Sequence, residues 1–100
     1  MAAYMICLRE TPIRDPAAMA EYSRQNRENA GAFRADYQLT PLVVYGALDA
    51  MEGAAPDGVI VLKFPTMADA RAWYDSPGYQ AALPHRMKAA DYKVFIVEGL

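Results

Sequence analysis

Short apolar runs without polar alternation are the feature that most constrains how this 100-residue chain can fold. The runs at residues 4–8, 42–45 and 59–62 are apolar at successive positions, so both faces of each predicted strand are apolar. A sheet with one face in water alternates apolar and polar residues instead. The sequence therefore predicts a sheet covered on both faces, by its own helices on one side and by other protein on the other.

Helical segments separate the predicted strands. We predict four strands and a turn-rich loop, with the strands at residues 2–9, 39–48, 59–64 and 92–97 and the loop at 52–58. A first helix begins at Asp15-Pro16, because aspartate accepts from free backbone N–H groups and proline fits the first helical position. A second helix begins after Thr66. Because proline disrupts a helix interior, Pro84 predicts two further helical pieces, at 77–82 and 84–90.

The resulting order, βαββαβ, is the ferredoxin-like pattern of the α+β class. It places a four-stranded antiparallel sheet beneath helices on one face. We expect one domain over residues 1–100, because a chain of this length forms a single core. Helices cover only one face of such a sheet, so the other face predicts a homodimer. An apolar content of 54% is consistent with surface that one copy cannot bury.

Charge and composition argue against several classes of function. The net charge is −2 and no basic stripe is present, so nucleic-acid binding is not expected. No apolar stretch reaches the roughly 18 residues of a membrane span, and no leader pattern is seen, so we expect a cytoplasmic protein with no membrane partner. Histidine and cysteine pairs at ligand spacing are absent, so we expect no metal and no cofactor. Cys7, in an apolar run, is predicted to be a buried, inert thiol.

The segment at residues 70–80 combines aromatic rings with polar tips at a helix start. It holds Trp73, the only tryptophan, and Tyr79. Indole and phenol groups seek hydrogen-bond partners when buried, so these rings can line a pocket, although core packing explains them equally well. On the inward stripe of the first helix, Asn26 lies one turn from Tyr22 and strengthens the pocket interpretation, because a buried amide needs a partner.

The segment Trp-Tyr-Asp-Ser-Pro-Gly-Tyr-Gln at residues 73–80 resembles the family called domain of unknown function 1330 (DUF1330). Further similarities to this family are Gly46, Glu52-Gly53, Phe64-Pro65, Arg86 and Val97-Glu98-Gly99. The resemblance implies the dimeric α/β-barrel fold, in which two ferredoxin-like sheets pack face to face. The same superfamily includes cofactor-free monooxygenases, muconolactone isomerases and haem-degrading enzymes, but the resemblance to DUF1330 implies no particular reaction.

The chain departs from the family pattern at two places. Members often carry Arg-Gly-Gly in the second strand, whereas this chain has Val44-Tyr45-Gly46 and so lacks one possible anion contact. Lys63 stands where many members have an acidic residue before Phe-Pro. Haem degradation is not favoured, because the first strand lacks the asparagine that those enzymes use.

We predict a pocket for a small organic molecule, anionic or aromatic, between the sheet and the helices. The expected ligand-binding residues are Tyr22, Asn26, Tyr45, Trp73 and Tyr79. His85 and Arg86 form the candidate catalytic pair, because histidine can act as a base near neutral pH and arginine attracts anions. If the protein is an enzyme, these residues favour a cofactor-free isomerase or monooxygenase. The alternative is a non-catalytic dimeric module whose aromatic residues are core packing.

Overall fold

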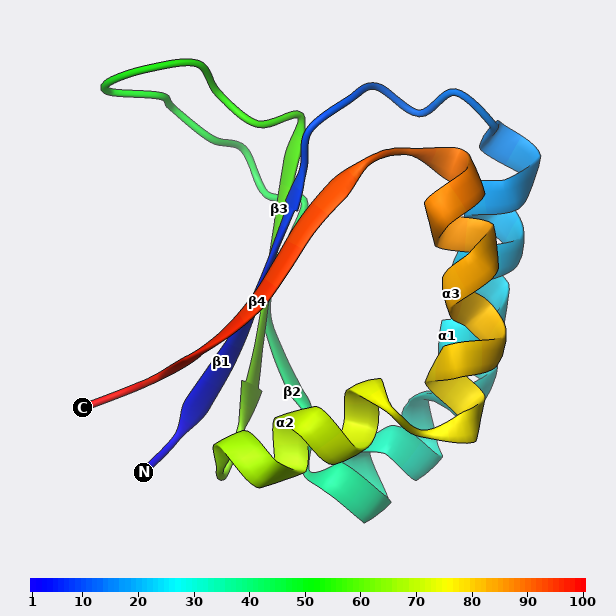
Figure 1. The fold of residues 1–100 in the computed structure, drawn as a ribbon, viewed down its shortest axis with the longest axis vertical. Coiled ribbons are helices and arrows are strands. Elements are labelled where there is room, and N and C mark those ends of the chain that lie inside the picture. Colours follow the sequence, from blue (N-terminus) through cyan, green and yellow to red (C-terminus); the bar gives the residue numbers. More distant parts are fainter.

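The computed structural model describes residues 1–100 and has an antiparallel sheet with helices packed on one face (Figure 1). In chain order the elements are β1 (Ala3–Arg9), α1 (Pro16–Tyr37), β2 (Thr40–Val44), β3 (Gly58–Phe64), α2 (Met67–Tyr74), α3 (Pro77–Ala89) and β4 (Tyr92–Glu98). The spatial strand order is β2-β3-β1-β4, and every neighbouring pair is antiparallel. The predicted ferredoxin-like α+β architecture is confirmed. No helix is both long enough and apolar enough to span a membrane.

Each helix begins at a side chain that caps it. The carboxylate of Asp15 accepts from the backbone N–H of Ala18 at the start of α1. The hydroxyls of Thr66 and Ser76 do the same for α2 and α3. Because the first N–H groups of a helix have no partner within it, such caps fix where a helix begins.

The second strand is shorter than the sequence predicts. β2 ends at Val44 because Tyr45 adopts a left-handed backbone conformation with φ 54°. An extended strand cannot continue through that conformation, so the chain leaves the sheet as the loop 45–57. Gly46 therefore lies in this loop and not inside a strand, which corrects the predicted strand at 39–48. In Figure 1 the loop projects from the sheet on the side away from the helices.

Pro84 lies inside one continuous helix, so the prediction of two separate pieces was wrong. Within α3 it cannot donate to the carbonyl of Gln80, the residue four positions earlier. Both residues are exposed, so water can replace the missing donor. The opposite side of the helix is buried at Leu83 and Arg86, and this burial holds the helix together through the proline.

The core lies between the sheet and the helices. Alternate residues of β1, namely Ala3, Met5 and Cys7, are buried against the helical layer. Burial raises the pKa of the Cys7 thiol to about 11, so the thiol is protonated at neutral pH, as expected of an inert cysteine. The Trp73 ring lies at the centre of this core, with its centroid 4.2 Å from that of Tyr79.

The other face of the sheet is not covered. Register pairs Ile6 with Phe95 on one side and with Val61 on the other, and all three point away from the helices. Phe95 and its neighbour on the same face, Val97, are each 48% exposed. The apolar residues that share this orientation form what we call the outer sheet face: Tyr4, Ile6, Leu8, Val43, Val59, Val61, Phe95 and Val97. This is the face that the sequence predicts to be covered by other protein.

The exposed position of Pro84 gives a test of the helix. We expect Pro84→Ala to raise the free energy of unfolding by up to about 3 kcal/mol, because alanine restores the missing N–H and removes the ring clash. Pro77→Ala is the matched control at the first helical position, where a change of no more than about 1 kcal/mol is expected. Urea unfolding measures both. A Pro84→Ala variant less stable than the parent would contradict this account.

Candidate functional site

A cavity of about 210 Å³ lies between α1 and the sheet, and we call it the inner cavity. Tyr22 and Asn26 reach it from α1, and Trp73 from α2. Tyr79 closes it from α3, and Cys7 from β1. A cavity of about 150 Å³ can hold a benzene ring, so the inner cavity has room for a single ring or a short chain.

Two polar atoms in the wall of the inner cavity have no partner within the protein. The Nε1 donor of Trp73 and the Oδ1 acceptor of Asn26 are both buried and unpaired. Trp73 itself is only 4% exposed. Buried polar groups are nearly always hydrogen-bonded, and an unsatisfied one is costly. One donor and one acceptor on residues that line the cavity therefore lack a partner within the protein.

A pair of tyrosine hydroxyls forms part of the same wall. The Tyr22 and Tyr79 oxygens lie 2.9 Å apart, and Nη1 of Arg86 donates to the Tyr79 oxygen at 3.2 Å. Burial is the main cause that raises the pKa of each tyrosine above its ordinary value. Both phenols are therefore protonated at neutral pH; one of their two hydrogens joins the two oxygens, and the other is free to donate.

Arg86 is a buried cation without an acidic partner. Its side chain is 6% exposed, its Nε atom is unpaired, and it takes part in no salt bridge. The guanidinium lies over the Tyr92 ring, with Cζ 4.9 Å from the centroid. A buried charge is unfavourable unless it is paired, so a bound anion here would be stabilised strongly.

Tyr45 lies at the end of the sheet, beside the inner cavity and not in its wall. Its hydroxyl is 2.5 Å from that of Tyr92, and its ring lies under the guanidinium of Arg9, 5.0 Å from Cζ. The ring also rests on Gly58, where a Cβ would come within 2.6 Å of it. Burial is the main cause that raises the Tyr45 pKa. Glycine at position 58 is what allows Tyr45 this placement.

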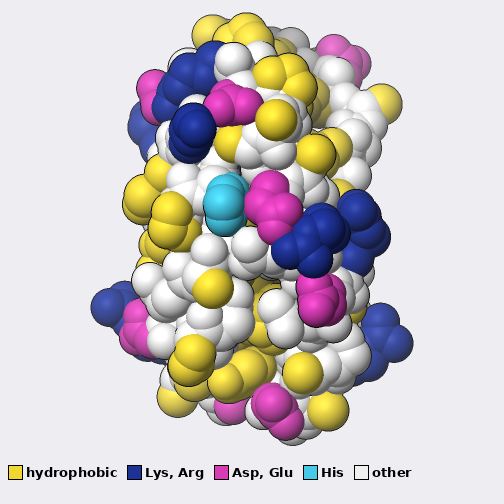
Figure 2. All heavy atoms as spheres, turned by 90° about the vertical axis from the view of Figure 1, so that its right-hand side faces the viewer, with side chains coloured by type: hydrophobic (Ala, Val, Ile, Leu, Met, Phe, Trp, Pro, Cys, Tyr) yellow, Lys and Arg dark blue, Asp and Glu magenta, His cyan; other side chains and the backbone are white.

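The structure does not bring His85 to the inner cavity. Adjacent helix positions diverge by about 100°, so Arg86 faces the interior and His85 lies on the outer side of α3. Figure 2 shows the single histidine on this surface, beside acidic side chains. Its nearby charge contributes to the lowered pKa of Glu21, which is about 2 chiefly because of hydrogen bonds from Arg24. His85 does not line the inner cavity, so the structure gives no contact that supports its predicted catalytic role.

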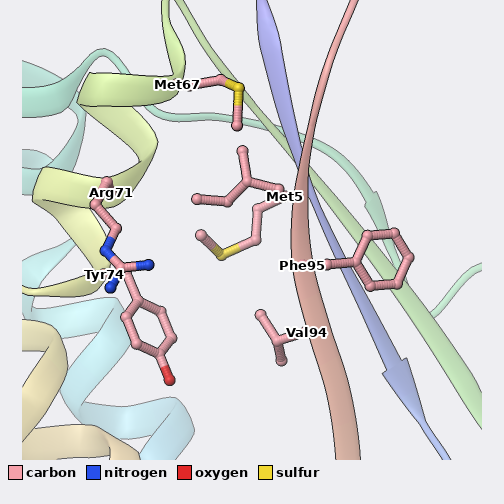
Figure 3. Close-up of a pocket in the computed structure, with 7 residues that line it drawn as sticks. Met5, Met67, Arg71, Tyr74, Val94 and Phe95 are labelled. Atoms are coloured by element: carbon pink, nitrogen blue, oxygen red, sulfur yellow. The ribbon is translucent and has the colours of Figure 1, made fainter.

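A second hollow, of about 380 Å³, lies between α2 and β4 (Figure 3). Its apolar wall includes Met5 and Val94, while Phe95 points away from it. Its one charged residue, Arg71, is already paired with Asp75 at 3.2 Å. This hollow is larger but has no unpaired buried polar atom. The inner cavity is therefore the candidate site.

Sequence reasoning missed two residues next to the site, Arg9 and Tyr92. Both face the helical side of the sheet, directly opposite each other in register. The signal was present in the alternation of β1, which puts Arg9 on the same face as Met5 and Cys7. An arginine at an inward strand position is unusual enough to mark a candidate site.

The chain belongs to the DUF1330 family, whose model matches residues 2–100. Among curated proteins nothing matches the chain. A protein of unknown function from Rhodopseudomonas palustris is 19% identical with a TM-score of 0.64, over 99% of this chain and 82% of its own. A dimeric ferredoxin-like protein of unknown function from Jannaschia sp. CCS1 is 12% identical with a TM-score of 0.70, over 99% and 100%. A Caulobacter crescentus protein assigned as an antibiotic biosynthesis monooxygenase is 14% identical with a TM-score of 0.61, over 99% and 90%. These likenesses establish the fold.

The central position of Trp73 gives a test of the cavity wall. We expect Trp73→Ala to lower the free energy of unfolding by about 3–5 kcal/mol, because the ring packs on Phe33, Phe64 and Tyr79. Trp73→Phe keeps an aromatic ring without the Nε1 donor, so a smaller loss is expected. Chemical denaturation measures both variants. A loss below about 1 kcal/mol for alanine would contradict a fully packed ring.

Proposed function

We propose that the inner cavity binds a small organic acid, with its apolar body or ring beside Trp73 and its carboxylate at the Tyr22–Tyr79 hydroxyl pair. The observation that carries this proposal is the buried, unpaired charge of Arg86, which donates to the Tyr79 oxygen. In this arrangement the one phenol hydrogen that the Tyr22–Tyr79 bond leaves free donates to the carboxylate, and the guanidinium behind the pair stabilises its negative charge. The unpaired atoms of Trp73 and Asn26 would orient a further polar group of the ligand.

The ionisable groups of the cavity wall favour binding over proton abstraction. The phenols of Tyr22 and Tyr79 have raised pKa values, and the Cys7 thiol has a pKa of about 11. None of the three is a base at neutral pH, and a general base needs a pKa near the working pH. We therefore propose a binding protein for small acids in preference to a cofactor-free isomerase or monooxygenase. The alternative is a non-catalytic module with a purely structural core. A measurement of ligand binding decides between this module and the binding protein.

We also propose that two copies pair through the outer sheet face. Apolar residues of all four strands lie on this face, with Lys63 and Lys93 near its two ends, and an apolar surface of this kind on a small chain is typical of an interface. The loop 45–57 projects on the same side and carries the exposed side chains Leu48 and Met51. A likeness in fold to a dimeric protein from Jannaschia sp. supports dimerisation itself.

Carboxylate binding is tested with benzoate and with benzyl alcohol, its neutral analogue. We expect benzoate to raise the melting temperature and to bind at least about tenfold tighter than the alcohol, because hydrogen bonds to a charged group contribute about 1.5–3 kcal/mol. Arg86→Gln should remove most of this difference. Arg27→Gln, which removes the same charge from an exposed position on α1, should not.

Calorimetry measures these affinities, and circular dichroism shows that each variant is folded. Equal binding of benzoate and the alcohol by the parent would contradict the carboxylate site. An Arg86→Gln variant with unchanged benzoate affinity would contradict the role of the guanidinium. No binding of any small acid would favour the purely structural module.

Dimerisation is tested by sedimentation. We expect the parent to sediment with twice the chain mass of 11.0 kDa at micromolar concentration. Val97→Lys should shift it toward the monomer, because it places a charge within an apolar interface. Met87→Lys puts the same charge on an exposed methionine of α3, outside the outer sheet face, and should leave the dimer intact. A parent that sediments as a monomer would end the proposal.

A further inference from the structure

A second arginine without an acidic partner lies at the end of β1. Arg9 faces the helical side of the sheet, in register with Tyr92 and Gly58. Its Nη2 atom donates to the Asp57 carbonyl at 3.1 Å, while its Nε atom is buried and unpaired. A guanidinium has five N–H donors, so most of its capacity for a carboxylate is unused.

Other arginines of the chain show that acidic partners are available. Arg14, Arg24 and Arg71 each form a salt bridge with an aspartate or glutamate on the surface. Arg9 and Arg86, which face the space between the sheet and the helices, have none; Arg27 and Arg34 of α1 also have none, but they are exposed. In a chain with net charge −2, two inward cations without acids are a local exception to the overall charge.

Two tyrosines join these arginines into one cluster. The Arg9 guanidinium lies over Tyr45 and the Arg86 guanidinium over Tyr92, while the two tyrosine hydroxyls lie 2.5 Å apart. Cation–π contact compensates a buried charge only in part and leaves both Nε donors unpaired. A carboxylate, by contrast, matches the fork of a guanidinium with two hydrogen bonds.

The cluster lies against the inner cavity. Val44, the residue before Tyr45, lines the cavity, and so does Cys7, which is two residues before Arg9 on the same strand face. Tyr45 also has a left-handed backbone, which non-glycine residues adopt rarely. Arg9 and Tyr45 do not line the cavity themselves, but they lie one or two residues along the chain from Val44 and Cys7, which do.

We propose that the ligand of the inner cavity is a small dicarboxylate and that Arg9 binds its second carboxylate. This inference rests on the proposed function, in which the first carboxylate lies at the Tyr22–Tyr79 pair beside Arg86. The cavity of about 210 Å³ limits the body between the two acidic groups to a short chain or a single ring. Two anionic groups would pair both inward cations at once.

The contribution of the second carboxylate is measured by comparing each dicarboxylate with the monocarboxylate of the same carbon number. The probes are glutarate against pentanoate and adipate against hexanoate, measured by calorimetry on the full chain. We expect at least one dicarboxylate to bind about tenfold or more tighter than its monocarboxylate, as hydrogen bonds to a charged group imply. Arg9→Gln should reduce that dicarboxylate to the level of the monocarboxylate and leave the monocarboxylate unchanged. Arg9→Lys, which keeps the charge, should retain part of the preference.

Arg27→Gln is the control for net charge, because Arg27 is exposed on α1, and it should retain the full preference. Circular dichroism confirms folding, and the comparison of probes on the parent needs no variant. Equal affinities within both pairs, or an undiminished preference in Arg9→Gln, would overturn the dicarboxylate inference while the carboxylate site stands. Failure of every acid, benzoate included, to bind would overturn both proposals.

Discussion

The packing of the Trp73 ring is the interaction on which the rest of the structure depends. It is in contact with Phe33 of α1, Phe64 of β3 and Tyr79 of α3, with ring centroids 4.2–5.7 Å apart. Edge-to-face and tilted contacts of this kind add to the free energy gained from burial. One side chain from the short helix α2 thus ties both long helices to the sheet. The layer that bounds the inner cavity is held in place by this contact.

The same aromatic packing leaves polar groups inside the protein. Aromatic residues with polar tips bury a large apolar surface, but each brings a donor that water no longer satisfies. Tyr22 and Tyr79 satisfy each other, whereas the Trp73 donor has no partner. Arg86 adds a whole charge to this interior. A core selected only for stability would not retain these groups, and this is why we interpret the cavity as a binding site.

The fold was predicted well from sequence because local signals and the hydrophobic pattern agree. The caps at Asp15, Thr66 and Ser76 mark the observed helix starts. The errors arose where tertiary structure overrides a local rule: burial keeps α3 continuous through Pro84, and the left-handed backbone of Tyr45 ends β2 early. The site was harder to predict for two reasons. No local pattern tells which of the adjacent helix residues His85 and Arg86 faces inward. Nor does a local pattern show that Arg9 at the end of β1 meets Tyr45 at the end of β2.

The contact between Tyr45 and Gly58 couples two positions that are far apart in the sequence. A Cβ at 58 would come within 2.6 Å of the Tyr45 ring, so a larger residue at 58 requires a smaller one at 45. Where relatives carry glycine in place of Tyr45, the left-handed backbone is unstrained and position 58 is free to vary. These two positions should therefore covary among homologues, with a bulky side chain at one or the other but never at both.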